Sequence, residues 1–439
     1  MGVKNAFLGR LLSSSDKFSD EQVAQTITLL IEHGVKHGAS DIHIEPYERF
    51  AQVRYRINND LRGMHKLPLA ALPAVVSQIK DLAGLNATND HLPQEGQYSA
   101  PVGEEQFEIQ VHTMPVIGGE KVVLHIARRL SKPLTLGQLG FWGTSLSAIQ
   151  NTLSRSHGLI IVATPRRNGR TTTMHSMLEM VTTPAVSVAT VEKTIEYRVP
   201  GISQTQVKPN SGITFSDAFR AAVNQDPNIL LLSDLTDKAT GDLAVQTAAG
   251  GHLVITGVHA NNAAAGLALL RTMTTEEPYL FAHAVCAAIS QRLVRKLCQR
   301  CRIAVHPSRD ELREIEKAFG ISSAAHRLQI HQLDSQAVKE GVGGTTPNTS
   351  ADGITGLWKA NEEGCEACNH SGYQGAIALV EVIESSDNTV QASLLTTPDA
   401  NKIRRAALKD GYISMELDGL IKALRGQTTI PEVLRTLAL

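Results

Sequence analysis

The chain has 439 residues, 42% hydrophobic and 19% charged, and its formal net charge is -1. This length predicts two or three domains with buried cores. The near-zero charge excludes bulk attraction to nucleic acid or anionic lipid, and no apolar run approaches the ~20 residues of a membrane-spanning helix. Arg10 and the three serines from Ser13 interrupt the short apolar N-terminal segment, which excludes a signal peptide. We therefore expect a cytoplasmic protein that binds no nucleic acid and associates with a membrane only through partners.

The first third of the chain has the pattern of an α+β domain. Apolar residues recur on one helical face from Glu21 to His37, and a second helix is predicted over Ala70–Leu85. Polar and apolar residues alternate over Ala51–Ile57 and Gln106–His112, as in half-exposed strands, and Lys121–Ile126 is a further predicted strand.

The pattern changes at Gly158 to apolar strands that alternate with helices, which is typical of a parallel α/β sheet. The predicted strands are Leu159–Ala163, Val186–Val191, Ile229–Leu232 and Leu253–Thr256. A small helical region is expected to close the chain.

A turn-forming segment, Thr164-Pro-Arg-Arg-Asn-Gly169-Arg170-Thr171, follows the first of these strands and opens its helix. The layout resembles a phosphate-binding loop, G-x-x-x-x-G-K-[ST], in which threonine replaces the first glycine and arginine replaces the lysine. The alternative is a strand–helix turn kept only for folding. The residues predicted to bind phosphate are Thr164, Pro165, Arg166, Arg167, Asn168, Gly169, Arg170, Thr171 and Thr172.

Four of the five cysteines form two C-x-x-C pairs. In a cytoplasmic chain this double pair favours a four-thiolate zinc site over disulfides, with free thiols or redox chemistry as the alternative. The fifth, Cys286, lies in an apolar stretch predicted to be helical and is expected to be buried. The predicted zinc ligands are Cys298, Cys301, Cys365 and Cys368.

Several further segments, together with both cysteine pairs, occur in the order found in one protein family. The chain resembles the hexameric ATPases that power type II secretion and type IV pilus assembly, from about Gln25 to its C-terminus. The segments are Ala39-Ser-Asp-Ile-His-Ile-Glu-Pro46, Leu92-Pro-Gln-Glu-Gly96, Gly119-Glu-Lys-Val-Val123, Gln225-Asp-Pro227, Gly251-His-Leu-Val254 and Gln291-Arg-Leu-Val-Arg-Lys-Leu-Cys298.

The resemblance implies a fold, cofactors and partners. It implies ATP with Mg²⁺ bound between a PAS-like N-terminal domain and a RecA-like P-loop domain, with structural Zn²⁺ in a helical C-terminal region. The implied partners are an inner-membrane platform protein and either further copies, as a homo-hexamer, or an active paralogue in a mixed oligomer. Such proteins usually carry an additional N-terminal docking domain, and we expect it to be missing because almost nothing precedes the first predicted helix.

With this fold class, an α/β chain with a P-loop core, the sequence divides into six segments. They are an N-terminal tail (1–20), the α+β domain (21–128), a linker (129–140), the P-loop domain (141–297), a tetracysteine region with a flexible insertion (298–370) and the C-terminal helical region (371–439).

The positions that match the family's catalytic groups depart from its pattern. Lys193 stands where the family has the aspartate of Glu-Asp-Pro, after Glu192. Asp234 stands for the glutamate that ends the Walker-B strand and is one methylene shorter. The resemblance assigns Asp234 and Glu192 to catalysis, although Glu192 has the alternative of a surface carboxylate. It also assigns His252 and His259, although a histidine at a strand end is more often structural.

The family's arginines are also replaced. In the family that the chain resembles, these arginines reach the nucleotide's phosphates and stabilise charge as arginine fingers do. Arg54 and Arg56 remain, although they are alternatively solvated on a strand face. The replacing residues are His91, Gln97, Gln110, His125, Asn224 and Thr236.

Three hypotheses about function follow. We favour a pseudo-ATPase or regulatory subunit, in which hydrolysis is impaired while the scaffold is kept. A slow but functional hexameric ATPase motor, with Arg170 and Asp234 in adapted roles, is the alternative from the enzyme class. A decaying paralogue that folds without a function is the third.

Overall fold

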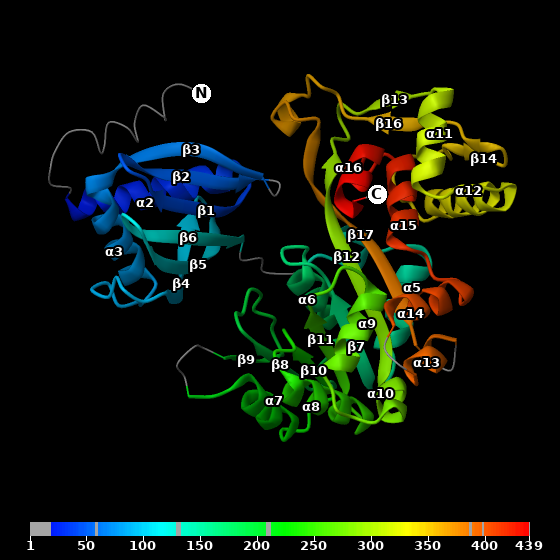
Figure 1. Cartoon of the computed structure of the whole chain (residues 1–439), viewed down its shortest axis with the longest axis horizontal. Helices are drawn as coiled ribbons and strands as arrows, with labels where there is room; N and C mark the ends of the chain where they lie inside the picture. Colours follow the sequence, from blue (N-terminus) through cyan, green and yellow to red (C-terminus); the bar gives the residue numbers. More distant parts are fainter. Residues whose placement is uncertain are drawn as a thin grey trace. The chain divides into compact units, whose positions relative to one another are not determined.

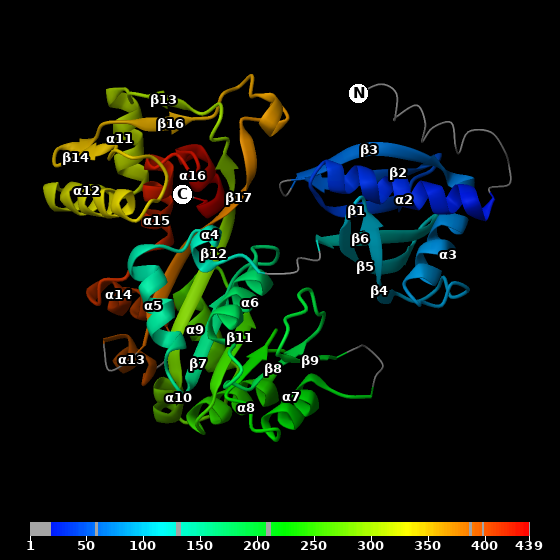
Figure 2. The ribbon, with the colours of Figure 1, turned by 180° about the vertical axis from the view of Figure 1, so that it is seen from behind.

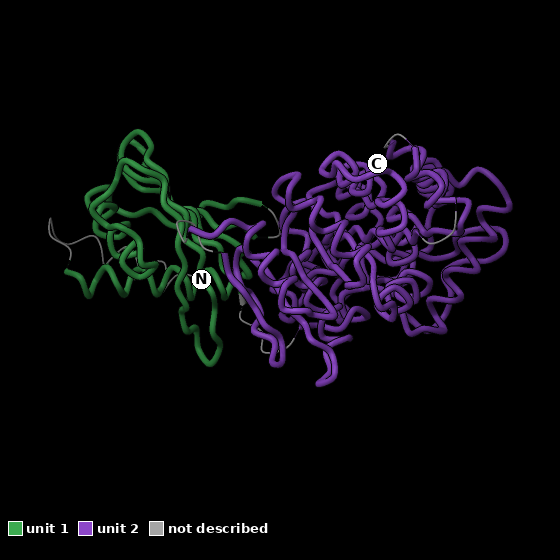
Figure 3. Tube along the Cα trace, turned by 90° about the horizontal axis from the view of Figure 1, so that it is seen from below, with its two compact units in different colours: residues 1–131 green, residues 132–439 purple. Residues whose placement is uncertain are grey.

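The chain forms two compact units, residues 1–131 and 132–439 (Figure 3). The computed structural model describes residues 19–57, 60–128, 133–207, 212–385, 389–396 and 399–438. Most of the predicted N-terminal tail, and residues 129–132 of the predicted linker, lie outside the described residues. No described helix has both the length and the apolar composition needed to cross a membrane.

The first unit is an antiparallel six-stranded sheet with two helices packed on it (Figure 1). Its strand order is β3-β2-β1-β6-β5-β4. The strands are β1 (Ala39–Pro46), β2 (Phe50–Ile57), β3 (Asp60–Pro68), β4 (Gln94–Val102), β5 (Glu105–Val116) and β6 (Gly119–Arg128). The helices are α2 (Asp20–Lys36) and α3 (Leu72–Leu82), the latter preceded by the 3₁₀ turn Leu69–Ala71.

Strand alternation gives this sheet one apolar and one polar face. Ile42 and Ile44 of β1 are fully buried in the core with α2 and α3. The Tyr55 hydroxyl donates to the carbonyl of Leu30 at 2.9 Å and so ties β2 to α2. The helix α2 begins at Asp20, within one residue of the predicted start at Glu21, and Ser19 caps it in a capping box.

The second unit is built on a seven-stranded sheet of order β17-β12-β7-β11-β10-β8-β9 (Figures 1 and 2). All neighbouring pairs are parallel except β12–β17. The strands are β7 (Gly158–Ala163), β8 (Val188–Glu192), β9 (Ser203–Gln206), β10 (Ile229–Leu232), β11 (Leu253–Val258), β12 (Val285–Leu297) and β17 (Tyr373–Glu384). The parallel α/β sheet predicted from the apolar strands is confirmed.

The prediction of a helix around Cys286 is wrong, because this residue lies in β12. The run from Val285 to Ser290 is buried on both faces, and such a run does not distinguish strand from helix by period. The predicted burial of Cys286 is confirmed, with 4% of the residue exposed. Gly158 is required beside it, since a Cβ there would lie 2.0 Å from its sulfur.

Helices cover both faces of this sheet. Ile160 and Val162 of β7 pack with α5 and α6, whereas Leu159 and Ile161 pack in a separate core with α7 to α10. Figure 1 views the face with α9, and Figure 2 the face with α5. The helices are α4 (Leu136–Leu139), α5 (Gly143–Leu153), α6 (Arg170–Val181), α7 (Phe215–Val223), α8 (Lys238–Ala249), α9 (Ala263–Thr272), α10 (Pro278–Ala284), α13 (Thr389–Leu394) and α14 (Ala400–Lys409).

Two predicted loose segments are structured. In the predicted linker, Thr135 caps α4, and Leu136 is buried in the core of the second unit. The predicted flexible insertion, Gly341 to Gly353, follows α12 and is held by Arg425, whose guanidinium donates to the carbonyls of Val342 and Thr346 at 2.9 and 2.6 Å. The insertion forms a lobe with the segment before it and with the last two helices. The elements of this lobe are β13 (Ile303–Val305), α11 (Arg309–Ala318), α12 (Ala324–Lys339), β14 (Thr349–Ser350), β15 (Gly353–Ile354), β16 (Leu357–Lys359), α15 (Met415–Leu424) and α16 (Ile430–Leu437).

Candidate functional site

Four parallel strands end at the same edge of the second sheet, and a polar residue follows each of them. Thr164 follows β7, Lys193 follows β8, His259 follows β11, and Asp234 comes two residues after β10. The carboxyl edge of a parallel sheet is where ligands bind in open α/β folds. The structure thus brings three predicted site residues together and adds Lys193 to them.

The turn after β7 adopts the backbone of a strand–loop–helix connection. Gly169 precedes α6 with a φ of 77°, and Arg167 has a φ of 64°. Gln291 of β12 donates to the carbonyl of Asn168 at 2.5 Å and accepts from the Thr173 hydroxyl at 2.7 Å. Gln291 was not predicted as a site residue, although it begins one of the family segments. It holds the loop against the neighbouring strand.

Three basic side chains surround the Asp234 carboxylate. Arg170 Nη2 lies 2.6 Å from Oδ1, and Lys193 Nζ lies 3.5 Å from Oδ2. His259 Nε2 lies 3.8 Å from Oδ1. Burial, together with the positive charge of Arg170, lowers the pKa of His259, so the imidazole is neutral at pH 7. The carboxylate is therefore neutralised by two permanent cations.

Two buried polar atoms of the loop have no hydrogen-bond partner in the described part of the chain. They are Thr164 Oγ1 and Arg170 Nη1. Thr164 is fully buried, and only 14% of the Arg170 side chain is exposed. Buried donors are nearly always satisfied in folded proteins, so an orphan at a loop–helix junction is a candidate ligand contact. Both atoms belong to residues predicted to bind phosphate.

Glu192 lies behind the loop, beneath the surface. Glu192 and His175 are both fully buried, and His175 Nε2 lies 3.0 Å from Glu192 Oε2. The other oxygen accepts from the Thr190 hydroxyl at 2.6 Å and from Gln204 at 3.2 Å. These donors occupy both oxygens, so the environment favours a structural role for Glu192 over the predicted catalytic one.

The hydroxyl that begins α6 is also engaged by a carboxyl group. Thr171 Oγ1 donates to Glu196 Oε1 at 3.3 Å. Burial raises the pKa of Glu196, which favours its protonated form. The neighbouring Thr172 hydroxyl lies 2.9 Å from the Tyr197 hydroxyl. The segment after Lys193 therefore folds back over the start of α6.

The two predicted histidines lie at opposite ends of β11. His252 immediately precedes the strand, and its Nδ1 lies 2.7 Å from the carbonyl of Pro227. His259 follows the strand and contacts Asp234. Six residues of strand span about 20 Å. His252 is thus separated from the carboxyl edge, and its geometry favours the structural alternative.

The two arginines retained in the first unit are paired within that unit. Arg54 Nη2 lies 2.5 Å from Glu45, which also contacts Lys121 at 2.6 Å. Arg56 Nε lies 3.2 Å from Asp41 on the same strand face. The alternative that Arg54 and Arg56 are simply solvated on a strand face therefore does not hold, because both form ion pairs.

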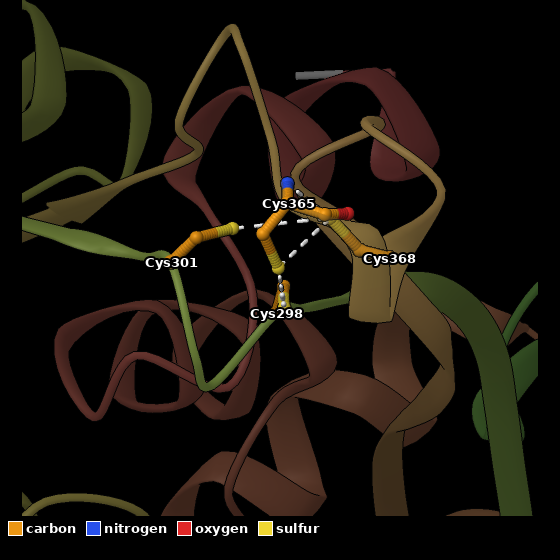
Figure 4. A group of neighbouring side chains, drawn as sticks. All are labelled: Cys298, Cys301, Cys365 and Cys368. Carbon is orange, nitrogen blue, oxygen red and sulfur yellow. Dashed lines mark hydrogen bonds between the residues drawn. The ribbon is translucent and has the colours of Figure 1, made fainter.

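The four paired cysteines converge beside the ends of β12 and β17 (Figure 4). Their sulfur atoms lie within 4.8 Å of one another, and three of the separations are 3.7–3.8 Å. A tetrahedral zinc ion with Zn–S bonds of ≈ 2.3 Å requires S···S separations of about 3.8 Å. The donor set and its spacing therefore fit Zn²⁺, which would have no open position and would serve structure.

Comparisons with known proteins agree on one family and one fold. The sequence model described as "Type II/IV secretion system protein" matches residues 16–435. The type IV pilus assembly ATPase PilB of Thermus thermophilus is 33% identical over 94% of this chain, which spans 43% of that relative. Type II secretion system protein E of Xanthomonas campestris is 33% identical over 96% of this chain, which spans 68% of that relative.

Two solved structures share the fold at low identity. The ATPase DotB of Legionella pneumophila superposes with a TM-score of 0.62 and 18% identity, covering 93% of this chain and 94% of its own. The pilus retraction motor PilT with bound ADP gives a TM-score of 0.56 and 16% identity, covering 93% and 96%.

Proposed function

This chain belongs to the type II/IV secretion system protein family, and from that membership we propose that it is a nucleotide-binding protein of a secretion or pilus machine with impaired ATP hydrolysis. It acts in the cytoplasm at the inner-membrane assembly platform. It does so as a regulatory subunit, in a homo-hexamer or beside an active paralogue.

The ion pair between Arg170 and Asp234 carries this proposal. In P-loop enzymes a lysine contacts the phosphates, while carboxylates hold the metal or orient the attacking water. Here the cation at the lysine position, Arg170, lies 2.6 Å from the carboxylate at the catalytic position, Asp234. The two side chains therefore form an ion pair with each other. Lys193 adds a positive charge beside them. The two groups that should act on opposite parts of the reaction are locked together.

The replaced arginines support the same proposal. An arginine that stabilises the transferred phosphoryl group is worth ~10³–10⁵ in rate where it has been measured in other enzymes. Glutamine or histidine at those positions supplies no permanent charge. Arg54 and Arg56 are already paired with carboxylates. Binding would survive these losses better than turnover.

The slow ATPase motor remains the second candidate, favoured by one observation. Arg170 Nη1 is buried and has no partner among the described residues, so this guanidinium can contact a phosphate while Nη2 stays on Asp234.

Steady-state phosphate release by the zinc-replete full chain separates the two candidates. We expect release at the background rate, with no further loss in Arg170→Ala. Robust release that disappears in Arg170→Ala would instead establish the slow motor.

A second experiment restores the family pattern with Arg170→Lys, Thr164→Gly, Asp234→Glu and Lys193→Asp together. A gain in phosphate release would assign the impairment to these four positions. The absence of a gain would assign it to the replaced arginines.

A further inference from the structure

In the part of the chain that the structure describes, the divalent cation that accompanies nucleotide in this family finds no free carboxylate at the site. Mg²⁺ is bound in proteins through one or two carboxylates together with waters and phosphate oxygens. Among the described residues, Asp234 is paired on one oxygen with Arg170 and lies 3.5 Å on the other from Lys193. Both oxygens of Glu192 accept hydrogen bonds from the protein in a fully buried position.

The other two acidic side chains described near this edge, Asp237 and Glu196, also accept hydrogen bonds from the protein. Asp237 caps α8, since its Oδ1 accepts from the backbone N–H and hydroxyl of Thr240 at 2.8 and 2.7 Å. Glu196 is partly buried and accepts from the Thr171 hydroxyl, which is the group that would otherwise bind the metal. The donor set therefore does not fit Mg²⁺.

The charge balance also disfavours a divalent cation. The carboxylate of Asp234 supplies one negative charge, whereas Arg170 and Lys193 supply two positive charges within 3.5 Å of it. A divalent ion placed there would be repelled by both neighbours. A phosphate anion would be attracted by them, and the excess positive charge is what an unaccompanied polyphosphate requires.

Lys193 is placed to bind such an anion with its side chain. Its backbone is fixed, because its N–H donates to the Ser233 hydroxyl at 3.3 Å and its carbonyl accepts from Gln206 at 3.1 Å. Its side chain is 58% exposed and reaches Asp234 only at 3.5 Å. An ammonium on a flexible four-carbon stem is a compact point charge with three donors. It can leave Asp234 for a phosphate oxygen without disturbing the fold.

The loop beneath it offers further contacts to the same anion. Arg170 Nη1 and Thr164 Oγ1 are buried without partners in the described part of the chain. The twelve-residue helix α6 begins at Arg170 and directs backbone N–H groups toward this edge. These groups need no metal to donate hydrogen bonds to a phosphate.

We propose that this site binds a nucleoside di- or triphosphate as the metal-free anion, with the Lys193 ammonium in the place of Mg²⁺. The proposal rests on the proposed function, because it takes the loop edge as the nucleotide site.

Calorimetric titration of the full zinc-replete chain with ATPγS tests it. The titration is run in excess Mg²⁺ and in Mg²⁺-depleted buffer made without a chelator, so that thiolate-bound zinc is retained. We expect excess Mg²⁺ to weaken the binding of ATPγS by about threefold or more, since the metal is repelled by Arg170 and Lys193 and competes with Lys193 for the phosphate oxygens. Equal dissociation constants in the two buffers would contradict the proposal. We expect Lys193→Ala to weaken metal-free binding by about tenfold or more, the effect of losing one charge-assisted hydrogen bond.

Three variants sharpen the comparison. Lys193→Arg keeps the charge and should restore most of the metal-free affinity. Lys193→Asp should make binding depend on Mg²⁺. Lys317→Ala removes the same charge from an exposed position on α11 and should bind as the unaltered chain does.

The outcomes distinguish this proposal from the proposed function. Binding that needs Mg²⁺ in the unaltered chain, or metal-free binding that survives Lys193→Ala, would overturn the role of Lys193 and leave nucleotide binding standing. No binding of ATPγS in either buffer would overturn both.

Discussion

At the scale of single residues, the contact between Arg170 and Asp234 depends on the residue that lies between them. A Cβ added to Gly257 of β11 would lie 2.8 Å from Arg170 Nε and 2.6 Å from the carbonyl of Ser233. The guanidinium therefore crosses the strand end only because that position has no side chain. Arginine is longer than lysine and planar, so it spans from the start of α6 to the end of β10.

Glu192→Gln separates a structural carboxylate from a catalytic one. Replacing the buried charge opposite His175 weakens charge-assisted hydrogen bonds, so we expect the free energy of unfolding to fall by about 1–3 kcal/mol. Urea denaturation followed by circular dichroism measures it. The exposed Glu314→Gln on α11 is the matched control and should change stability by less than about 0.5 kcal/mol. Unchanged stability with reduced phosphate release would assign Glu192 to catalysis instead.

At the scale of elements, the last helix is fastened to the long strand β12 by charge. Arg295 Nη2 lies 2.5 Å from Glu432 of α16, and Arg292 donates to the carbonyl of Thr436 at 2.6 Å. Arg435 reaches the same Glu432 carboxylate at 3.0 Å. Helix α16 thus covers the part of β12 that extends beyond β7, and the C-terminal region becomes part of the second unit.

The Glu432 cluster predicts a dependence of stability on pH. Burial alone would raise the pKa of Glu432, but hydrogen bonds and charge from Arg295 and Arg435 lower it to about 2. Its unfolded pKa is about 4.3. The folded pKa is the lower one, so the stabilisation is complete above pH ~4.3 and is lost as pH falls toward 2.

Denaturant unfolding of the unaltered chain and of Glu432→Gln between pH 6 and pH 2 measures this effect. The difference in free energy of unfolding should shrink as the pH falls through that window. A difference that stays constant with pH would show that the carboxylate is not held by the two arginines.

At the scale of the whole molecule, each unit has its own hydrophobic core, and the cysteine cluster organises a lobe of the second one. Cys298 and Cys301 follow β12, and Cys365 and Cys368 precede β17. The 63 residues between Cys301 and Cys365 hold α11 and α12. A zinc ion held by the four thiolates would close this long segment at its base and so remove many unfolded conformations.

We expect elemental analysis to find about one zinc per chain. Removing it with a chelator should lower the melting temperature by at least about 5 °C and open residues 302–364 to proteases, because the metal closes this segment. Cys365→Ser should reproduce both effects. Cys286→Ser, outside the cluster, should retain zinc. A metal-free protein with the same melting temperature and protease resistance would exclude a structural zinc site.

Much of the fold and half of the site follow from local patterns. The alternation in Ala51–Ile57 has the period of a strand, and the apolar runs before Thr164 and Ser233 are short and bounded by turn residues, which indicates buried strands. The C-x-x-C spacing predicts that the four cysteines meet, since four thiolates that share one metal ion must lie together, and the structure brings them together. The loop predicted to bind phosphate is recognisable because strand, glycine and helix follow one another along the chain.

The remainder depends on which distant residues meet. The first residues of β12, from Val285 to Ile289, are apolar on both faces, so only pairing with β7 and β17 shows that they form a strand. Glu192 and His252 have the sequence context of site residues, yet one is enclosed by protein donors and the other lies at the far end of β11. The sequence by itself determined strands such as β2, β7 and β10, the loop between strand and helix, and the cysteine tetrad. Only the tertiary structure brought Arg170 and Lys193 onto Asp234, because parallel strands place their carboxyl ends side by side irrespective of separation along the chain.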